Sequence, residues 1–265
     1  MGVRRGVGGR GAMIHTDNRA GYTPLHHAAW SGHTQVADLL LARGALAMGT
    51  TQGGLTPFHC AAANGHTLMM QLLLRHGADP NAGDCNQWTS LHWATAGRQL
   101  HIIVKLLLQN QADGNLADSR GCTPLHKAAA AGSLPSVYLL LQGSSPASVT
   151  RRDGLLLTPL HHAVLCGHAD VAGCLLAHGA DVNAAGWLGK TALHLAAEMK
   201  SIPLMELLIA NGADLSQKTW WKETAEDLAL VKKPETRIFS SCALPGCQQM
   251  CRYGSLHLIS EEPSC

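Results

Sequence analysis

The stretch Thr23-Pro24-Leu25-His26-His27-Ala28-Ala29 decides the fold, because close copies of it return along the chain at an almost constant interval. Copies with the same threonine and histidine begin at Thr23, Thr56, Thr89, Thr123, Thr158 and Thr191, and a degenerate seventh copy begins at Thr224. The intervals between successive threonines are 33, 33, 34, 35, 33 and 33 residues. A period of this length is the signature of a repeat architecture, so we expect one array of stacked units.

Three further features keep the phase of this motif. A glycine follows the threonine by nine residues at Gly32, Gly65, Gly132 and Gly167. A leucine-rich run comes next, at residues 39–41, 72–74, 106–108, 139–141 and 207–209, and a Gly-Ala pair closes the unit at 44–45, 77–78, 179–180 and 212–213. The return of these four features in one phase along six units excludes coincidence.

Each unit is typical of a helix-turn-helix element. Threonine is a good N-cap and proline is tolerated at the first helical position, so Thr-Pro predicts the start of a short first helix. The glycine in the middle of the unit predicts its C-cap and a turn, and the leucines then belong to a second helix. Pro135 and Pro203 fall at the opening of such second helices. One unit cannot bury its apolar face alone, so stacking must do it.

With these motifs in hand, the chain resembles the ankyrin repeat family, whose signature includes T-P-L-H-x-A at this period. The resemblance covers residues 13–231 as about six full repeats plus a partial seventh. It implies an all-α solenoid of stacked helix-turn-helix units with projecting hairpin loops, and a role as a protein-binding scaffold. We expect the Gly/Arg-rich residues 1–12 and the Cys/Pro/Ser-containing residues 232–265 to be disordered.

Two units depart from the pattern. The third carries one extra residue between Leu91 and Leu106, which moves Gly97 out of phase. The fourth lacks the Gly-Ala-Asp closure and runs from Gln142 to Asp153 through a Ser/Pro/Arg-containing stretch, which produces the 35-residue interval. We expect an irregular connection at this junction.

Composition limits the classes of partner. Only 14% of the residues are charged and the formal net charge is +2, so there is no basic surface typical of a nucleic-acid binder. No stretch of 18 apolar residues occurs in the sequence, so we do not expect insertion into a membrane. The scattered cysteines of the periodic region are typical of reduced thiols in an intracellular protein, cytoplasmic or nuclear. We expect a monomer that binds a protein partner.

The sixteen histidines follow the repeat rather than a metal-ligand spacing. Six are the motif histidine itself, and three more follow the glycine in the middle of the unit, so we expect neutral imidazoles that hydrogen-bond to neighbouring turns. The histidines concerned are His26, His59, His92, His126, His161 and His194, and His33, His66 and His168. Cys242, Cys247 and Cys251 lack the paired C-x-x-C spacing of a zinc knuckle. The sequence predicts no metal site and no cofactor.

Catalytic motifs are missing from the sequence as well. There is no glycine-rich phosphate loop, no G-x-S-x-G elbow, no H-E-x-x-H and no kinase signature. We therefore expect that the protein is not an enzyme.

The aromatic residues are the unusual feature, with six tryptophans against two phenylalanines and three tyrosines. Alignment of the units on their threonines places Trp187 and Trp220 at the same loop position, with Trp221 beside the latter. Because the resemblance implies that these positions face the surface, and exposed aromatic residues are enriched in interfaces, we interpret them as partner-binding. The predicted set is Trp187, Trp220, Trp221, Trp88, Tyr22, Trp30 and Trp93. The alternative is that the rings pack on neighbouring loops and support the stack.

These residues predict a non-enzymatic interaction scaffold that binds a partner through its loop tips and its concave first-helix face, with the loop-tip tryptophans as anchor. The alternative is a substrate-recruiting adaptor, in which residues 232–265 recruit ubiquitin-ligase or signalling machinery. Asn81 and Asn183 also resemble the ankyrin-repeat asparagines that a dioxygenase hydroxylates, since each follows a leucine by eight residues and an aspartate by two. The structural alternative is that both asparagines only satisfy a turn.

Overall fold

The protein is described by a computed structural model, which covers residues 17–97, 101–143 and 146–230. Within these ranges the regular structure is helical, and no strand occurs. The helices are α1 (Pro24–Ser31), α2 (Thr34–Ala42), α3 (Pro57–Ala63), α4 (Thr67–Arg75), α5 (Ser90–Ala96), α6 (His101–Gln109), α7 (Pro124–Ala131), α8 (Leu134–Gln142), α9 (Pro159–Leu165), α10 (Ala169–Ala177), the 3₁₀ helix η1 (Trp187–Gly189), α11 (Ala192–Glu198), α12 (Ile202–Ala210) and α13 (Ala225–Leu230).

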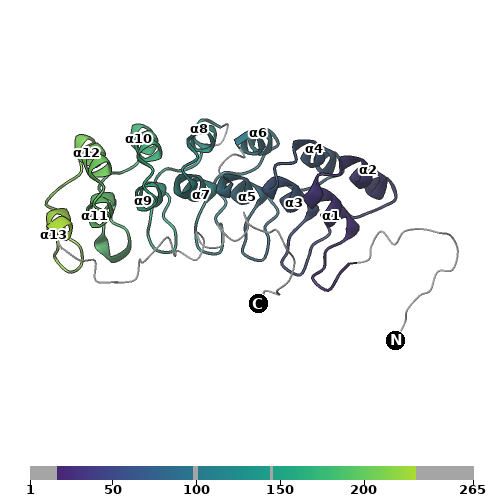
Figure 1. The fold of residues 1–265 in the computed structure, drawn as a ribbon, viewed down its shortest axis with the longest axis horizontal. Helices are drawn as coiled ribbons and strands as arrows, with labels where there is room; N and C mark the ends of the chain where they lie inside the picture. Colours follow the sequence, from purple (N-terminus) through teal and green to yellow (C-terminus); the bar gives the residue numbers. More distant parts are fainter. Residues whose placement is uncertain (1–16, 98–100, 144–145, 231–265) are drawn as a thin grey trace.

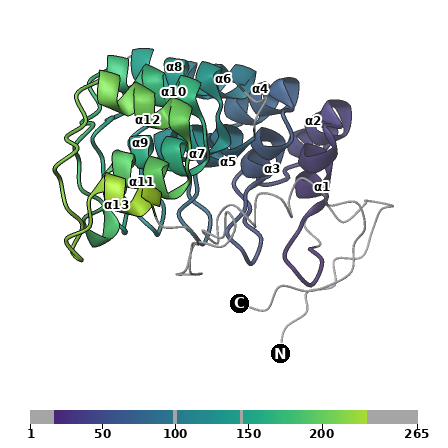
Figure 2. The same ribbon diagram turned by 60° about the vertical axis from the view of Figure 1, so that its left-hand side comes forward.

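The helices form two layers. Figures 1 and 2 show two rows of helices. One row holds α1, α3, α5, α7, α9 and α11 side by side, and the row above it holds α2, α4, α6, α8, α10 and α12. Long loops project from the first-helix row, on the side away from the second helices. This is the solenoid that the 33-residue period predicts, and the predicted fold class is confirmed.

The threonine of the motif caps each first helix, as predicted. It adopts an extended conformation before the helix, and it exchanges hydrogen bonds with the histidine three residues later in a reciprocal capping box. Proline occupies the first helical position in α1, α3, α7 and α9. Since both partners of the box are local, a short motif is enough to start the helix wherever it occurs.

The core consists of the apolar positions of the repeat. The residue two places after the threonine is fully buried in each first helix, at Leu25, Phe58, Leu91, Leu125, Leu160 and Leu193. The small residues that follow, such as Ala28 and Ala29, allow the backbones of neighbouring first helices to approach. Each second helix contributes a buried leucine, at Leu41, Leu73, Leu107, Leu140, Leu175 and Leu208. All belong to one continuous cluster that runs through the stack.

The glycine in the middle of the unit makes the turn between the two helices. Gly32 and Gly132 are left-handed C-caps, with φ of 74° and 69°. A Cβ atom at Gly32 would lie 2.6 Å from the imidazole of His66 in the next unit. Contact with that unit is therefore a second reason for glycine at position 32. The out-of-phase Gly97 is extended, with φ of −80°. The 13–231 boundary of the array stays a prediction, since residues 13–16 and 231 lie outside the described ranges.

Candidate protein-binding surface

The motif histidines link each unit to the next. In His26, His59, His92, His126 and His161 the Nδ1 atom accepts a hydrogen bond from the backbone N–H of the motif threonine, at 3.1–3.2 Å. Nε2 lies 2.9–3.3 Å from a carbonyl oxygen in the loop of the following unit. Because Nδ1 accepts, each ring is neutral with its proton on Nε2. The predicted structural role of these histidines is confirmed.

Burial keeps these imidazoles uncharged. It lowers the pKa of His92 to about 4, and burial with the neighbouring His162 lowers that of His126 to about 3. Carbonyl acceptors raise the pKa in both cases, but the loss of hydration outweighs them.

The loops form a continuous edge along the array. In four neighbouring pairs a backbone N–H of one loop donates to a carbonyl of the preceding loop, from Gln52 to Ala20, Cys85 to Gly53, Ser119 to Asn86 and Gly154 to Arg120. A buried aspartate shapes three of these loops by accepting from the N–H groups two and four residues later, at Asp84, Asp118 and Asp153. The loop tips are therefore held at fixed spacing, which suits them to present side chains to a partner.

Two indoles are exposed at one end of this edge. Trp220 and Trp221, in the loop between α12 and α13, are 70% and 54% exposed. The backbone N–H of Trp220 donates to the carbonyl of Leu188, and its ring lies against Gly189 of the preceding loop. Trp187, at the equivalent position in η1, is half-buried. The prediction that all three face solvent is therefore correct for two of them and wrong for Trp187.

The remaining predicted aromatics belong to the first-helix layer. Trp30, near the end of α1, is 38% exposed, and Tyr22 is half-buried beside His26. Trp88 and Trp93 are half-buried as well, and their rings meet edge to face at 5.1 Å. Trp88 and Trp93 are less exposed than predicted, because the two rings cover each other, and their role in partner binding stays a prediction beside the alternative that the rings support the stack.

A small apolar hollow lies between these aromatics. Its lining comes from Trp30 of α1, Trp93 of α5, three residues of α3 and the loop before α3; the last two groups are His59, Cys60, Ala63 and Leu55. Its volume is about 20 Å³, which is far below the roughly 300 Å³ of a small-molecule site. The hollow suits the tip of one apolar side chain of a partner.

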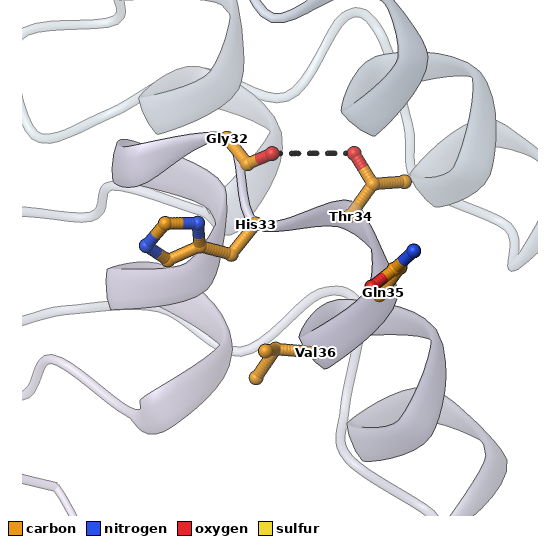
Figure 3. A pocket seen from close by; sticks show the side chains of 5 residues that line it. All are labelled: Gly32, His33, Thr34, Gln35 and Val36. Atoms are coloured by element: carbon orange, nitrogen blue, oxygen red, sulfur yellow. Dashed lines mark hydrogen bonds between the residues drawn. The ribbon is translucent and has the colours of Figure 1, made fainter.

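A larger hollow of about 350 Å³ lies at the start of α2. Figure 3 shows its lining, the consecutive residues 32–36, with the His33 ring pointing away from Thr34 and Gln35. The one hydrogen bond drawn there, from Thr34 Oγ1 to the carbonyl of Gly32, closes a local turn. One chain segment supplies the whole lining, and this segment contains no lysine, arginine, aspartate or glutamate. We therefore interpret the hollow as a surface groove that the turn itself forms.

Two buried polar clusters were missed by the sequence reasoning. Lys127 lies 2.8 Å from the carboxylate of Asp118 and 4.7 Å above the ring of Trp88. One unit further along the array, Asp153 Oδ2 lies 2.8 Å from His162 Nε2 and 3.7 Å from Cys122 Sγ. Each cluster combines one residue of a unit with two residues of the next unit. The first directly precedes the motif threonine of its unit, and the other two lie five places before and four places after the next motif threonine. A comparison of these three positions along the array would have found both clusters.

The ionisable groups of the second cluster are strongly affected by their surroundings. Burial raises the pKa of the Cys122 thiol to about 12. Burial alone would raise the pKa of Asp153 too, but the hydrogen bond from His162 and those from the backbone bring it below its ordinary value. Asp153 is therefore an ionised carboxylate, and Cys122 carries its proton.

Asn81 and Asn183 occupy equivalent positions after the second helices. The side-chain amide of each donates to a carbonyl of the next unit, Gln111 and Gly212, and accepts from a backbone N–H there, Asp113 and Asp214. Asn115, which the sequence reasoning did not single out, does the same. The turn-satisfying role is present in the structure, and hydroxylation stays a prediction.

Comparison with known proteins agrees with this architecture. The family models for ankyrin repeats match residues 20–48, and residues 46–118, 82–153 and 148–219 as three overlapping blocks. Together they cover far more than half of the chain, so the protein belongs to the ankyrin repeat family.

Two individual relatives illustrate the family. A fowlpox virus (strain NVSL) protein, "Putative ankyrin repeat protein FPV230", is 34% identical over 67 residues, which are 25% of this chain and 35% of that protein. The matched segment thus spans about a third of that relative. The crystal structure of the human ASB11 ankyrin repeat domain superposes with a TM-score of 0.72 at 28% identity, covering 80% of this chain and 94% of that one.

Family membership bears on function at a general level. Ankyrin repeats are generally modules of protein–protein interaction, and proteins built from them are typically non-enzymatic. Over the described residues, the longest helices have nine residues, and none is long and apolar enough to cross a membrane.

Proposed function

We propose that the protein is a non-enzymatic scaffold that binds a partner protein through its loop tips and its first-helix face, with Trp220 and Trp221 as the anchor. The exposure of these two adjacent indoles carries the proposal. Large aromatic side chains exposed on a fixed framework are enriched among the residues that dominate binding energy.

The surroundings of the pair support this role. The Trp220 ring lies against Gly189, and its backbone is bonded to Leu188, so its position is defined before any partner arrives. An ordered anchor loses little conformational entropy on binding. The apolar hollow lined by Trp30 and Trp93 offers a second contact point in the first-helix layer.

The experiment uses the full chain as bait in cells, with identification of co-purified proteins, followed by calorimetry with the purified partner. Replacement of Trp220 and Trp221 by alanine is expected to weaken binding by more than about 30-fold, the equivalent of one hot spot of about 2 kcal/mol. Trp30→Ala, tested separately, measures the contribution of the first-helix face.

Leu68→Ala is the matched control, because Leu68 is an apolar residue of the second-helix layer with 68% exposure. It should leave binding unchanged. Far-UV circular dichroism must show the same helix content in all variants. Binding that is equally strong in the double tryptophan variant would show that the anchor is elsewhere.

The alternative role as an adaptor depends on residues 232–265, which lie outside the described residues. A binding assay that compares the full chain with residues 1–231 separates the two roles, because a scaffold keeps its partners after truncation and an adaptor loses one class of them.

A further inference from the structure

The junction between the fourth and fifth units brings together three side chains of different ligand chemistry. Cys122 precedes α7, Asp153 precedes α9, and His162 lies in α9. All three are buried, and Cys122 Sγ, one Asp153 carboxylate oxygen and one His162 ring nitrogen lie within 4.8 Å of one another. A single ion placed among these atoms would contact all three after small side-chain adjustments.

The preceding junction holds a cation at the same place in the repeat. Trp88, Asp118 and Lys127 occupy the positions that correspond to Cys122, Asp153 and His162 one unit later. There the ammonium of Lys127 lies 2.8 Å from the carboxylate of Asp118 and 4.7 Å from the centre of the Trp88 ring. This position between two units therefore accommodates a positive charge beside the loop aspartate.

The fold itself does not require a polar cluster at this position. At the next junction the corresponding residues are Leu157, Gly186 and Leu195, which are all buried. Asp153 also shapes its own loop, but since apolar side chains and glycine suffice at the next junction, the stack does not require a cysteine and a histidine beside it.

We propose that Cys122, Asp153 and His162 bind one Zn²⁺ ion between the fourth and fifth repeats. A thiolate, an imidazole and a carboxylate form a ligand set that suits this borderline-soft cation, and three protein ligands leave a fourth position for water. Because Cys122 comes from one unit and the other two ligands from the next, the ion joins two repeats.

Proton and charge balance favour the buried complex. Zn²⁺ takes the place of the Cys122 thiol proton, which leaves to solvent. The proton that His162 Nε2 donates to Asp153 in the metal-free site must leave Nε2 as well, and the imidazole then binds the metal through Nε2 with its proton on Nδ1. Zn²⁺ with one thiolate and one carboxylate is neutral, and the neighbouring Lys127–Asp118 pair is neutral as well. No uncompensated charge is then buried.

The consequence is a local clamp at the longest interval of the array. The fourth and fifth threonines are 35 residues apart, and the connection through Gln142 to Asp153 lacks the usual Gly-Ala-Asp closure. A metal that binds only the folded state stabilises it in proportion to the logarithm of its concentration. This proposal is independent of the one on Trp220 and Trp221.

The test uses the reduced, EDTA-treated full chain with Cys242, Cys247 and Cys251 replaced by serine, which removes metal binding by those thiols. We expect one equivalent of Zn²⁺ by calorimetry, a higher midpoint of thermal unfolding with Zn²⁺, and with Co²⁺ the visible bands of a tetrahedral site and a thiolate charge-transfer band. Cys122→Ser should abolish the charge-transfer band, and His162→Gln should weaken binding more than about tenfold.

Cys174→Ser is the control, because Cys174 lies 3.8 Å from His178 as a cysteine–histidine pair without a third ligand. It should leave stoichiometry and spectrum unchanged. Unchanged Zn²⁺ binding in Cys122→Ser, or no binding in the parent chain, would overturn the proposal and leave the three side chains as a hydrogen-bonded network only. If circular dichroism shows that Cys122→Ser does not fold, His162→Gln decides between the same two outcomes.

Discussion

The Nε2 atom of His59 lies 2.9 Å from the carbonyl oxygen of Ala82, in the loop that leads to the next unit. The same ring accepts the backbone N–H of Thr56 on Nδ1, so one buried imidazole caps its own helix and bonds to the following repeat. His59→Gln cannot do both, and we expect it to lower the free energy of unfolding by about 2 kcal/mol. Urea denaturation followed by circular dichroism measures this. His27→Gln, at an exposed histidine of α1, should change stability by less than about 0.5 kcal/mol.

The protein should lose stability as the pH falls below about 6.5. Burial lowers the pKa of His26 and His59 from 6.5, and the nearby carboxylate of Asp84 and carbonyl acceptors only partly oppose this for His59. Between the unfolded pKa and the lower folded pKa, the unfolded chain binds protons that the native state does not, so the free energy of unfolding decreases as pH decreases. Thermal midpoints from pH 7.5 to 4.5, measured with EDTA, should fall more steeply for the wild type than for His59→Gln. Parallel profiles would contradict this assignment.

Gly54→Ala should destabilise the array far more than Gly44→Ala. Both glycines have positive φ, 74° and 92°, so alanine costs about 1 kcal/mol in either place. A Cβ atom at Gly54 would also lie 2.8 Å from the backbone nitrogen of Cys85, whereas nothing lies within 4 Å at Gly44. Because that neighbour is backbone of the next loop, we expect a further loss of about 1–3 kcal/mol, read from thermal unfolding. Equal effects would mean that the loops adjust without cost.

Lys127→Met should destabilise the protein by about 3 kcal/mol, because it leaves the buried carboxylate of Asp118 without its cation. Adding Asp118→Asn removes the charge but keeps the side-chain oxygen that accepts from Arg120 and Cys122. The double variant should therefore recover most of the loss. Chemical denaturation of the two single variants and the double variant gives the coupling free energy between Lys127 and Asp118. If the losses of unfolding free energy in the single variants add up in the double variant, the buried ion pair is contradicted.

Local relationships in this chain could be predicted from sequence, whereas relationships across repeats could not. The threonine and histidine of the capping box are three residues apart, so the motif alone predicts the helix start, the first-helix core and the neutral histidines. The exposure of Trp93 depends on Trp88 of its own unit, and also on α1, α3 and the loop before α3, which lie next to it only through stacking. The sequence therefore predicts more exposure for Trp88, Trp93 and Trp187 than the structure shows, and the role of the aromatic residues in partner binding stays a prediction.

The cluster of Cys122, Asp153 and His162 was missed for the same reason. Asp153 and His162 follow Cys122 by 31 and 40 residues along the chain. Cys122 comes from one unit and Asp153 and His162 from the next, so only the packing of the two units brings the three ligand atoms together. A comparison of equivalent positions along the array, rather than a search for short spacings, is the signal that finds such sites.

The paired hydrogen bonds of Asn81 determine when this residue can be modified. Its side-chain amide is hydrogen-bonded at both ends to the next unit, through Gln111 and Asp113, so an enzyme that acts on this side chain has to compete with both bonds. Any hydroxylation there would proceed at a rate set by how often the neighbouring repeats separate. The degree of modification would then record the opening frequency of the array in the cell, and a partner that holds the repeats together would protect the asparagine without touching it.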